Sequence, residues 1–174
     1  MRKMVRKKGV SVLCTLIMFC SIFSTCLINV NASGDSKVQV DGSYLTTDDT
    51  STGSTNSGKG GISTFGLHLM DGQCSITKSG SGKIYAYAGT TANHDVDYLS
   101  AVMYVDRYNE TTKTWGQIYF EQVSDYNTYF VCVGKTLYVE KGYYYRVRGT
   151  HAGGMKDDLP YEELVSVTNG IWIN

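Results

Sequence analysis

From Leu67 to the C-terminus, apolar and polar side chains alternate with a period of two. This alternation is typical of β-strands that bury one face, because successive side chains of a strand point to opposite sides. Asp97–Arg107 is the clearest case, and its apolar face holds Leu99, Ala101, Met103 and Val105. The only candidate for a helix is 157–165, which Pro160 interrupts. The pattern therefore predicts an all-β domain over 67–174.

Seven segments show this alternation of apolar and polar residues, and clusters of Gly, Asn, Asp and Thr that favour turns separate them. The segments are Leu67–Thr77, Lys83–Thr90, Asp97–Arg107, Trp115–Val123, Tyr129–Val139, Tyr143–His151 and Val165–Ile173. Short strands at near-regular spacing in about 100 residues predict a seven-stranded antiparallel β-sandwich.

The segment from Val139 to Val147 carries the most specific fold signal. Gly142 follows an apolar residue by three positions, and Tyr145 follows Gly142 by three more. This spacing matches the corner of immunoglobulin and fibronectin-III-like sandwiches, where a Tyr hydroxyl bonds to upstream backbone. We predict that Tyr145 is this corner residue, that Gly142 shapes the turn, and that Trp172 fills the core at the end of the last strand.

Residues 1–32 have the composition of a secretory signal peptide. A basic leader precedes the uncharged stretch from Val10 to Val30, and small residues follow at Ala32 and Ser33. We predict export to the extracellular space with cleavage after Ala32. Two alternatives are an uncleaved anchor, since about 20 apolar residues can span a bilayer, and a lipoprotein modified at Cys26.

Residues 33–66 differ from the rest, because more than half of this segment is Ser, Thr or Gly and its apolar residues are isolated. Such a stretch buries too little apolar surface to offset its ordering entropy, so we predict a flexible, disordered linker. A short strand at Lys37–Val40 or at Ser43–Leu45 is the alternative.

The sandwich resembles the domain of unknown function 6147 family, which comprises small secreted proteins of Gram-positive Firmicutes. The matching segments are Gly80–Ile84, Thr90–Ala92, Tyr104–Tyr108 with Trp115 and Gly116, Lys141–Gly149 with His151, and Thr168–Ile171. The resemblance spans roughly 79–173. It implies a small exported protein of no known activity, and no catalytic residue comes with it.

Charge and cysteine content limit the partners. The segment 1–32 holds five basic side chains and no acidic one, so the balanced charge of the whole chain leaves a mildly acidic remainder. Such a remainder lacks the basic face that nucleic acids and anionic membranes require, so we expect no nucleic-acid partner and membrane contact only through the signal segment.

Cys74 and Cys132 are the two exported cysteines, and export permits a disulfide between them, although Cys132 is expected to point away from the core.

No motif for catalysis or for a cofactor is present. His68, His94 and His151 are far apart in the sequence, whereas zinc sites usually have two ligands at short spacing. No Gly-x-Ser-x-Gly motif occurs. The carboxylate pairs, such as Asp157-Asp158, lack the spacing of a calcium loop and are interpreted as solvated charges. We predict a protein that is not an enzyme and holds neither a metal nor another cofactor.

The tyrosines are the feature that most suggests binding, since all but one of the 14 fall within 67–174. Several alternate with core positions and should face outward, where aromatic rings can stack on sugars or peptides. Tyr is also simply a good strand former on a half-solvated face. The candidate binding residues are Tyr85, Tyr87, Tyr98, Tyr104, Tyr144, Arg146 and His151. We predict a non-enzymatic extracellular module for a cell-surface glycan or protein; the alternative is a secreted bacteriocin-like effector or toxin.

Overall fold

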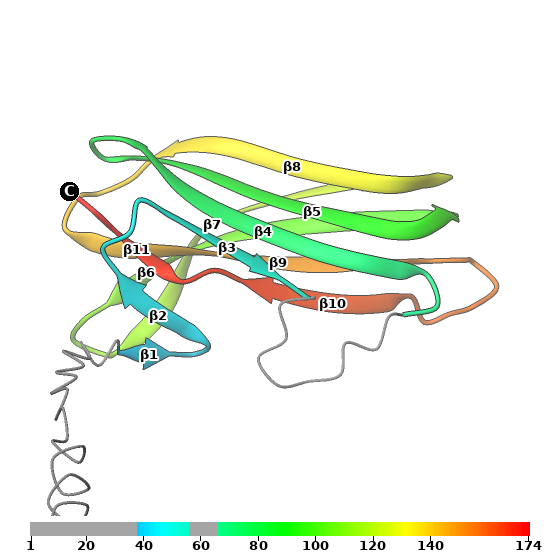
Figure 1. Cartoon of the computed structure of the whole chain (residues 1–174), viewed down its shortest axis with the longest axis horizontal. Helices are drawn as coiled ribbons and strands as arrows, with labels where there is room; N and C mark the ends of the chain where they lie inside the picture. The colour runs from blue at the N-terminus through cyan, green and yellow to red at the C-terminus, as the bar shows by residue number, and fades with distance from the viewer. Residues whose placement is uncertain (1–37, 56–65) are drawn as a thin grey trace, which may run out of the picture. The chain divides into compact units, whose positions relative to one another are not determined.

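Two β-sheets make up the described part of the chain, which comprises residues 38–55 and 66–174 of the computed structural model (Figure 1). The all-β prediction is confirmed, and two sheets are consistent with the predicted sandwich. No helix within these residues is long and apolar enough to cross a membrane. The predicted signal segment, 1–32, lies outside the described residues.

One sheet has seven strands in the order β1-β2-β11-β9-β6-β7, with β10 also paired to β9, and the other has the order β3-β4-β5-β8. The strands of the domain predicted from sequence are β4 (Leu69–Gly80), β5 (Lys83–Val96), β6 (Tyr98–Asn109), β7 (Thr114–Asp125), β8 (Thr128–Tyr138), β9 (Tyr143–Gly154), β10 (Glu162–Val167) and β11 (Gly170–Ile173). The first six of these correspond to the first six predicted strands.

The predicted seventh strand is divided into β10 and β11, both of which pair with β9. Thr168 lies at the break, where its Oγ1 accepts a hydrogen bond of 3.0 Å from the backbone N–H of Val147. A side chain thus replaces a backbone group in the ladder, and the strand resumes at Gly170.

Three further strands lie where a disordered linker was predicted: β1 (Gln39–Val40), β2 (Ser43–Thr46) and β3 (Thr50–Ser54). For 39–54 the linker prediction is wrong, and the alternative of short strands is confirmed by β1 and β2. The compact unit includes these strands as well as the region after Leu67. β2 pairs with β11 in parallel, and β3 pairs with β4 antiparallel. Backbone pairing with β11 and β4 stabilises this segment, together with bonds such as the one of 2.7 Å from Ser43 Oγ to the Thr168 carbonyl. Burial of apolar side chains, on which the prediction was based, contributes little here.

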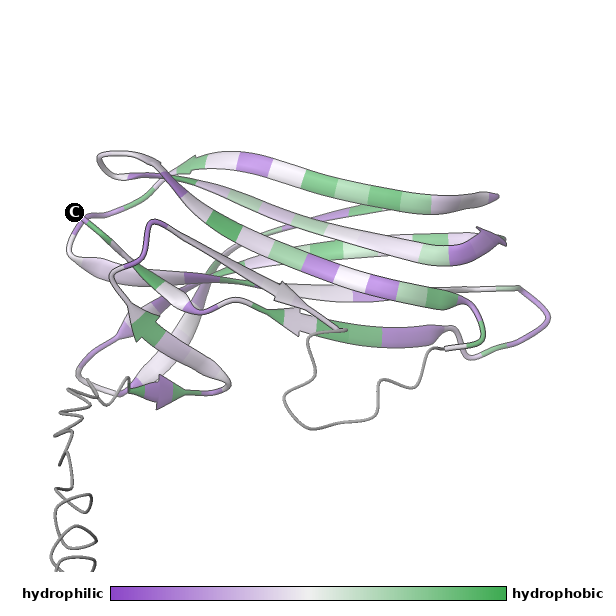
Figure 2. Ribbon diagram, in the orientation of Figure 1, coloured by the Kyte–Doolittle hydropathy of each residue, from purple (hydrophilic) through white to green (hydrophobic). Residues whose placement is uncertain are grey.

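The core lies between the sheets, and the alternation read from the sequence places its residues correctly. Hydropathy alternates along β4, as Figure 2 shows. The apolar face of β6 is fully buried. One core cluster forms around Ile76, Met103 and Ile171, and a second around Leu69, Leu99 and Val131.

Tyr145 occupies the predicted corner. Its side chain is 1% exposed, and its hydroxyl donates a hydrogen bond of 2.8 Å to the upstream carbonyl of Glu140. Gly142 has φ of 81°, a conformation that L-residues rarely adopt, and its N–H bonds to the Ile173 carbonyl at 2.7 Å. The corner therefore ties the β8–β9 connection to the end of β11.

Trp172 does not fill the core. Ile171 and Ile173 are buried, so Trp172 between them points to the outer face of the sheet, where its ring packs edge-on against Tyr144 with centroids 4.9 Å apart. The prediction of a core position for Trp172 is wrong, because the register of β11 assigns that face to its two neighbours.

Replacing Tyr145 with Phe should lower the free energy of unfolding by about 1 kcal/mol, since the ring keeps its packing but the bond to the Glu140 carbonyl is lost. Urea denaturation would measure the change. Tyr143→Phe is the matched control, because the hydroxyl of this partly exposed neighbour bonds to no group in 38–55 or 66–174. Equal effects of the two changes would contradict the corner bond.

Candidate functional site

The tyrosines predicted as one binding surface lie on the outer faces of two different sheets. Tyr85 and Tyr87 belong to β5, in the sheet β3-β4-β5-β8. Tyr98 and Tyr104 lie on β6, and Tyr144 lies on β9, in the other sheet. The structure thus separates the candidate residues into two groups that cannot contact one ligand face together.

On the sheet that contains β6 and β9, the candidate rings pack against other side chains. Tyr98 stacks on Tyr161 with ring centroids 5.0 Å apart. Tyr104 stacks on Phe120, and the guanidinium of Arg148 lies 4.9 Å from its ring centre. Tyr144 packs against Trp172 and Tyr108. These contacts occupy ring surface that a ligand would need.

Arg146 is buried, with 2% of its side chain exposed, and it cannot reach a ligand. Its Nε donates to Asp106 Oδ2 at 3.0 Å, and Nη2 donates to Asp41 Oδ2 at 2.7 Å. The hydrogen bond and charge of Arg146 hold the pKa of Asp41 below its usual value. The prediction of a binding role is therefore wrong: Arg146 fastens the turn between β1 and β2 to the sheet.

His151 is fully buried in the core and is likewise not a binding residue. Its Nδ1 lies 2.9 Å from Thr90 Oγ1, and its Nε2 lies 2.8 Å from Ser166 Oγ. Burial lowers the pKa of His151 to about 4, although the Asp71 carboxylate acts in the opposite direction. A neutral ring with both nitrogens bonded has a structural role.

Tyr85 and Tyr87 differ from the other candidates, because each ring lies over a glycine on the outer face. A Cβ added to Gly134 would be 2.2 Å from the Tyr85 hydroxyl oxygen, and one added to Gly89 would be 2.4 Å from that of Tyr87. Only glycine leaves room for a ring at this height. The rings therefore lie along the sheet, and we call these four residues the tyrosine–glycine platform.

The strand register extends the platform into rows of side chains that cross all four strands. From β3 to β8, the rows are Thr50, Thr77, Tyr85 and Thr136; then Thr52, Ser75, Tyr87 and Gly134; then Ser54, Gln73, Gly89 and Cys132. None of the residues in these rows carries a formal charge at neutral pH. The face presents hydroxyl, amide and phenol groups.

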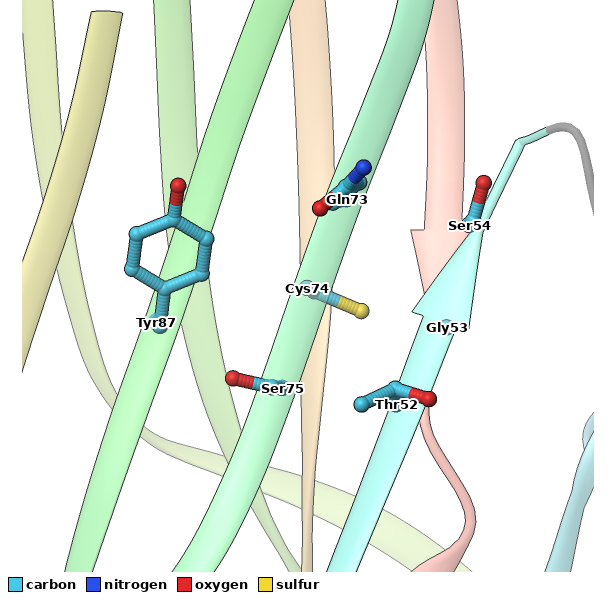
Figure 3. A pocket seen from close by; sticks show the side chains of 7 residues that line it. All are labelled: Thr52, Gly53, Ser54, Gln73, Cys74, Ser75 and Tyr87. Carbon is cyan, nitrogen blue, oxygen red and sulfur yellow. The ribbon is translucent and has the colours of Figure 1, made fainter.

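A hollow of about 370 Å³ lies beside Tyr87, within the range of small-ligand sites (Figure 3). It is lined by Thr52, Gly53, Ser54, Gln73, Cys74, Ser75 and Tyr87. Figure 3 shows the Tyr87 ring face-on along β5, with Gln73 and Ser75 on the neighbouring strand β4. The hollow therefore has one aromatic wall and polar side chains opposite it.

Asp71 organises one end of the hollow. Its Oδ1 accepts hydrogen bonds from Ser54 Oγ at 2.8 Å and Thr55 Oγ1 at 2.9 Å, and its Oδ2 accepts one from Gln73 Nε2 at 2.7 Å. Burial alone would raise the pKa of Asp71, but these bonds and one from the backbone of Gly72 outweigh it and keep the pKa below its usual value. Asp71 is ionised at neutral pH and serves as an acceptor only.

Cys74 and Cys132 are both free, so the disulfide considered from the sequence is not formed. Cys74 points into the core, where burial raises the pKa of its thiol to about 11. Cys132 is exposed on the outer face of β8, and β5 separates the two strands. The side chains therefore lie on opposite faces of one sheet.

The structure does bring two histidines together just before the start of β4, at Leu69. His68 Nδ1 lies 3.2 Å from His94 Nε2, and His68 Nε2 lies 3.1 Å from Asp158 Oδ2. Within 38–55 and 66–174, no group of three or more His, Cys, Asp or Glu side chains could hold a metal ion. His151 takes no part in this cluster, because it lies in the core.

No family model matches the sequence, and no curated protein is similar to it. The candidate site therefore depends on the geometry of the outer face of β3-β4-β5-β8. Sequence reasoning selected Tyr85 and Tyr87 but missed Gln73, Ser75 and Asp71. The available signal was the pair of glycines, because Gly89 follows Tyr87 by two positions on the same face of the strand.

Proposed function

We propose that this domain is a non-enzymatic module that binds a glycan of a cell surface through the tyrosine–glycine platform. The observation that carries the proposal is that the rings of Tyr85 and Tyr87 extend over Gly134 and Gly89. Rings in this position offer their faces for stacking, and successive rings on one strand face are about 7 Å apart. The hydroxyl and amide groups around them can bond to sugar hydroxyls.

A sugar suits this face better than an extended peptide does. A peptide that adds a strand needs a free sheet edge, whereas β4 and β5 are each paired on both sides. Side chains alone are available over the platform, and their stacking and hydrogen-bonding groups match a ligand that has an apolar face and many hydroxyls.

The double variant Tyr85→Ala with Tyr87→Ala should lose about 5- to 150-fold in apparent affinity, because aromatic stacking contributes roughly 0.5–1.5 kcal/mol per ring. A glycan array and a pull-down on peptidoglycan would measure this for the purified protein. Tyr104→Ala is the matched control, since it removes a ring from the outer face of the other sheet. Absence of retention of the unmodified protein on both materials, or equal loss in the control, would overturn the proposal.

Several finer assignments accompany this proposal. The orders β4-β5-β8 and β11-β9-β6-β7, with Tyr145 at the corner, support an immunoglobulin or fibronectin-III-like sandwich. Export with cleavage after Ala32 and membership of the domain of unknown function 6147 family stay predictions from the sequence. The effector alternative also stays a prediction, and growth inhibition of neighbouring strains by the purified protein would test it.

A further inference from the structure

The hollow beside Tyr87 contains polar groups with hydrogen-bonding capacity to spare. The hydroxyls of Thr52 and Ser75 line it, and neither hydroxyl bonds to another group within the described residues. Gln73 also lines it, and its amide uses one N–H on Asp71. Its amide oxygen remains available as an acceptor. Three side chains on β3 and β4 can thus bond to a ligand that stacks on Tyr87 from β5.

Asp71 fixes the orientation of the Gln73 amide. An ionised carboxylate only accepts hydrogen bonds, so the NH₂ group of Gln73 must face Asp71 and the oxygen must turn away from it. Figure 3 shows this oxygen on the side of Gln73 nearer Tyr87. Because the bond to Asp71 already orients the Gln73 oxygen, this acceptor loses little conformational entropy when a ligand binds. This favours recognition of a hydrogen-bond donor such as a sugar hydroxyl.

The charges around the hollow select against anionic ligands. The three rows of side chains contain no Lys or Arg, so an anion would gain no ion pair there. Asp71 is the charged group bonded directly to residues of the hollow, and it is negative. A sulfated, phosphorylated or carboxylated sugar would lose hydration and meet this charge without compensation.

We propose that the hollow is a subsite for one neutral sugar residue, which stacks on Tyr87 and bonds to Gln73, Ser75 and Thr52. The inference rests on the proposed function and deepens it by naming the ligand class and the residues that select it. Asp71 is a positioning residue, since it acts through Gln73.

The test is a glycan array that pairs neutral oligosaccharides with their sulfated and uronic-acid counterparts, read at several concentrations of the full-length protein. The retained sugars should be neutral, and their charged counterparts should bind at least tenfold more weakly. Gln73→Leu and Ser75→Ala should each reduce apparent affinity about threefold to tenfold, since each removes one hydrogen bond. Ser124→Ala is the matched control, because it removes an exposed hydroxyl from β7, in the other sheet, and should change affinity less than twofold.

The outcomes separate the two proposals. Preference for charged sugars, or unchanged binding by both Gln73→Leu and Ser75→Ala, would overturn the neutral subsite and leave the platform in place. Retention of no oligosaccharide by the unmodified protein would overturn both. Ser75→Ala is a small change at the surface, so it decides the matter even if Gln73→Leu disturbs the fold. Thermal unfolding of each variant verifies that it is folded.

Discussion

Arg146→Met should lower the free energy of unfolding by about 3–5 kcal/mol, the usual cost of breaking a buried ion pair by removing one partner. Asp106 is 1% exposed and would keep only its bonds from Arg148. The turn at Asp41 would lose two bonds from Nη1 and Nη2. Because total stability of a domain is typically about 5–15 kcal/mol, this one change removes a large share of it. Urea denaturation would measure the loss.

Two comparisons show whether the buried charge is responsible. Arg107→Met removes an exposed pair with Glu140 and should cost less than about 1 kcal/mol. The double variant Arg146→Met with Asp106→Asn should recover part of the lost free energy of unfolding. In the single variant a buried carboxylate has one partner fewer, and Asp106→Asn removes the charge of that carboxylate. The pKa of Asp41 should also rise toward its ordinary value in Arg146→Met, which NMR titration can follow. A loss no larger than that of Arg107→Met would contradict the proposed role.

Arg146 also shows how one wrong prediction produced another. The alternation of β9 places Tyr145 and Val147 in the core and Arg146 on the outer face, as predicted. That face is covered here, because the carbonyl of Val40 accepts a bond from Trp115 Nε1 and the turn at Asp41 bonds to Arg146. The covering strands belong to the segment predicted as a linker. Local composition allowed short strands in this segment but could not reveal that they cover Arg146, since the side chains that hold them are distant in the sequence.

The core of the sandwich could be predicted because it depends on local pattern. Period-two alternation identifies which face of β5 and β6 is buried, and the spacing from Gly142 to Tyr145 identifies the corner. The candidate site depends on register between strands instead. Gln73 lies opposite Gly89 only because β4 and β5 pair as they do, and no periodicity within either strand contains that information.

The burial of His151 could have been read from the sequence, because the alternation of β9 places it on the core face with Tyr145 and Val147. Two glycines make room for the ring: a Cβ on Gly72 would lie 2.2 Å from His151 Cδ2, and one on Gly149 would lie 2.6 Å from Nε2. Thr90 Oγ1 donates its proton to the Ser100 carbonyl at 2.8 Å, so Nδ1 of His151 must donate to Thr90. Nε2 is then free to accept from Ser166.

This arrangement predicts that the protein loses stability in mild acid. The pKa of His151 is about 4 in the folded state, below its ordinary value of 6.5, so between these values the unfolded chain binds the extra proton. Stability therefore falls as pH falls through this window, by about 1.4 kcal/mol per pH unit once below 6.5. From pH 7.5 to pH 5 the contribution of His151 should decrease by about 2 kcal/mol, measured by urea denaturation at each pH.

His151→Gln isolates this contribution, because glutamine can bond to Thr90 or Ser166 but does not titrate. The variant should be less stable than the unmodified protein at pH 7.5 and should approach it at pH 5, so the difference between them narrows by about 2 kcal/mol. His68→Gln is the comparison, since His68 is bonded to Asp158 and its removal leaves the titration of His151 intact. Parallel stability curves for His151→Gln and the unmodified protein would show that the buried imidazole is not what makes the fold sensitive to acid.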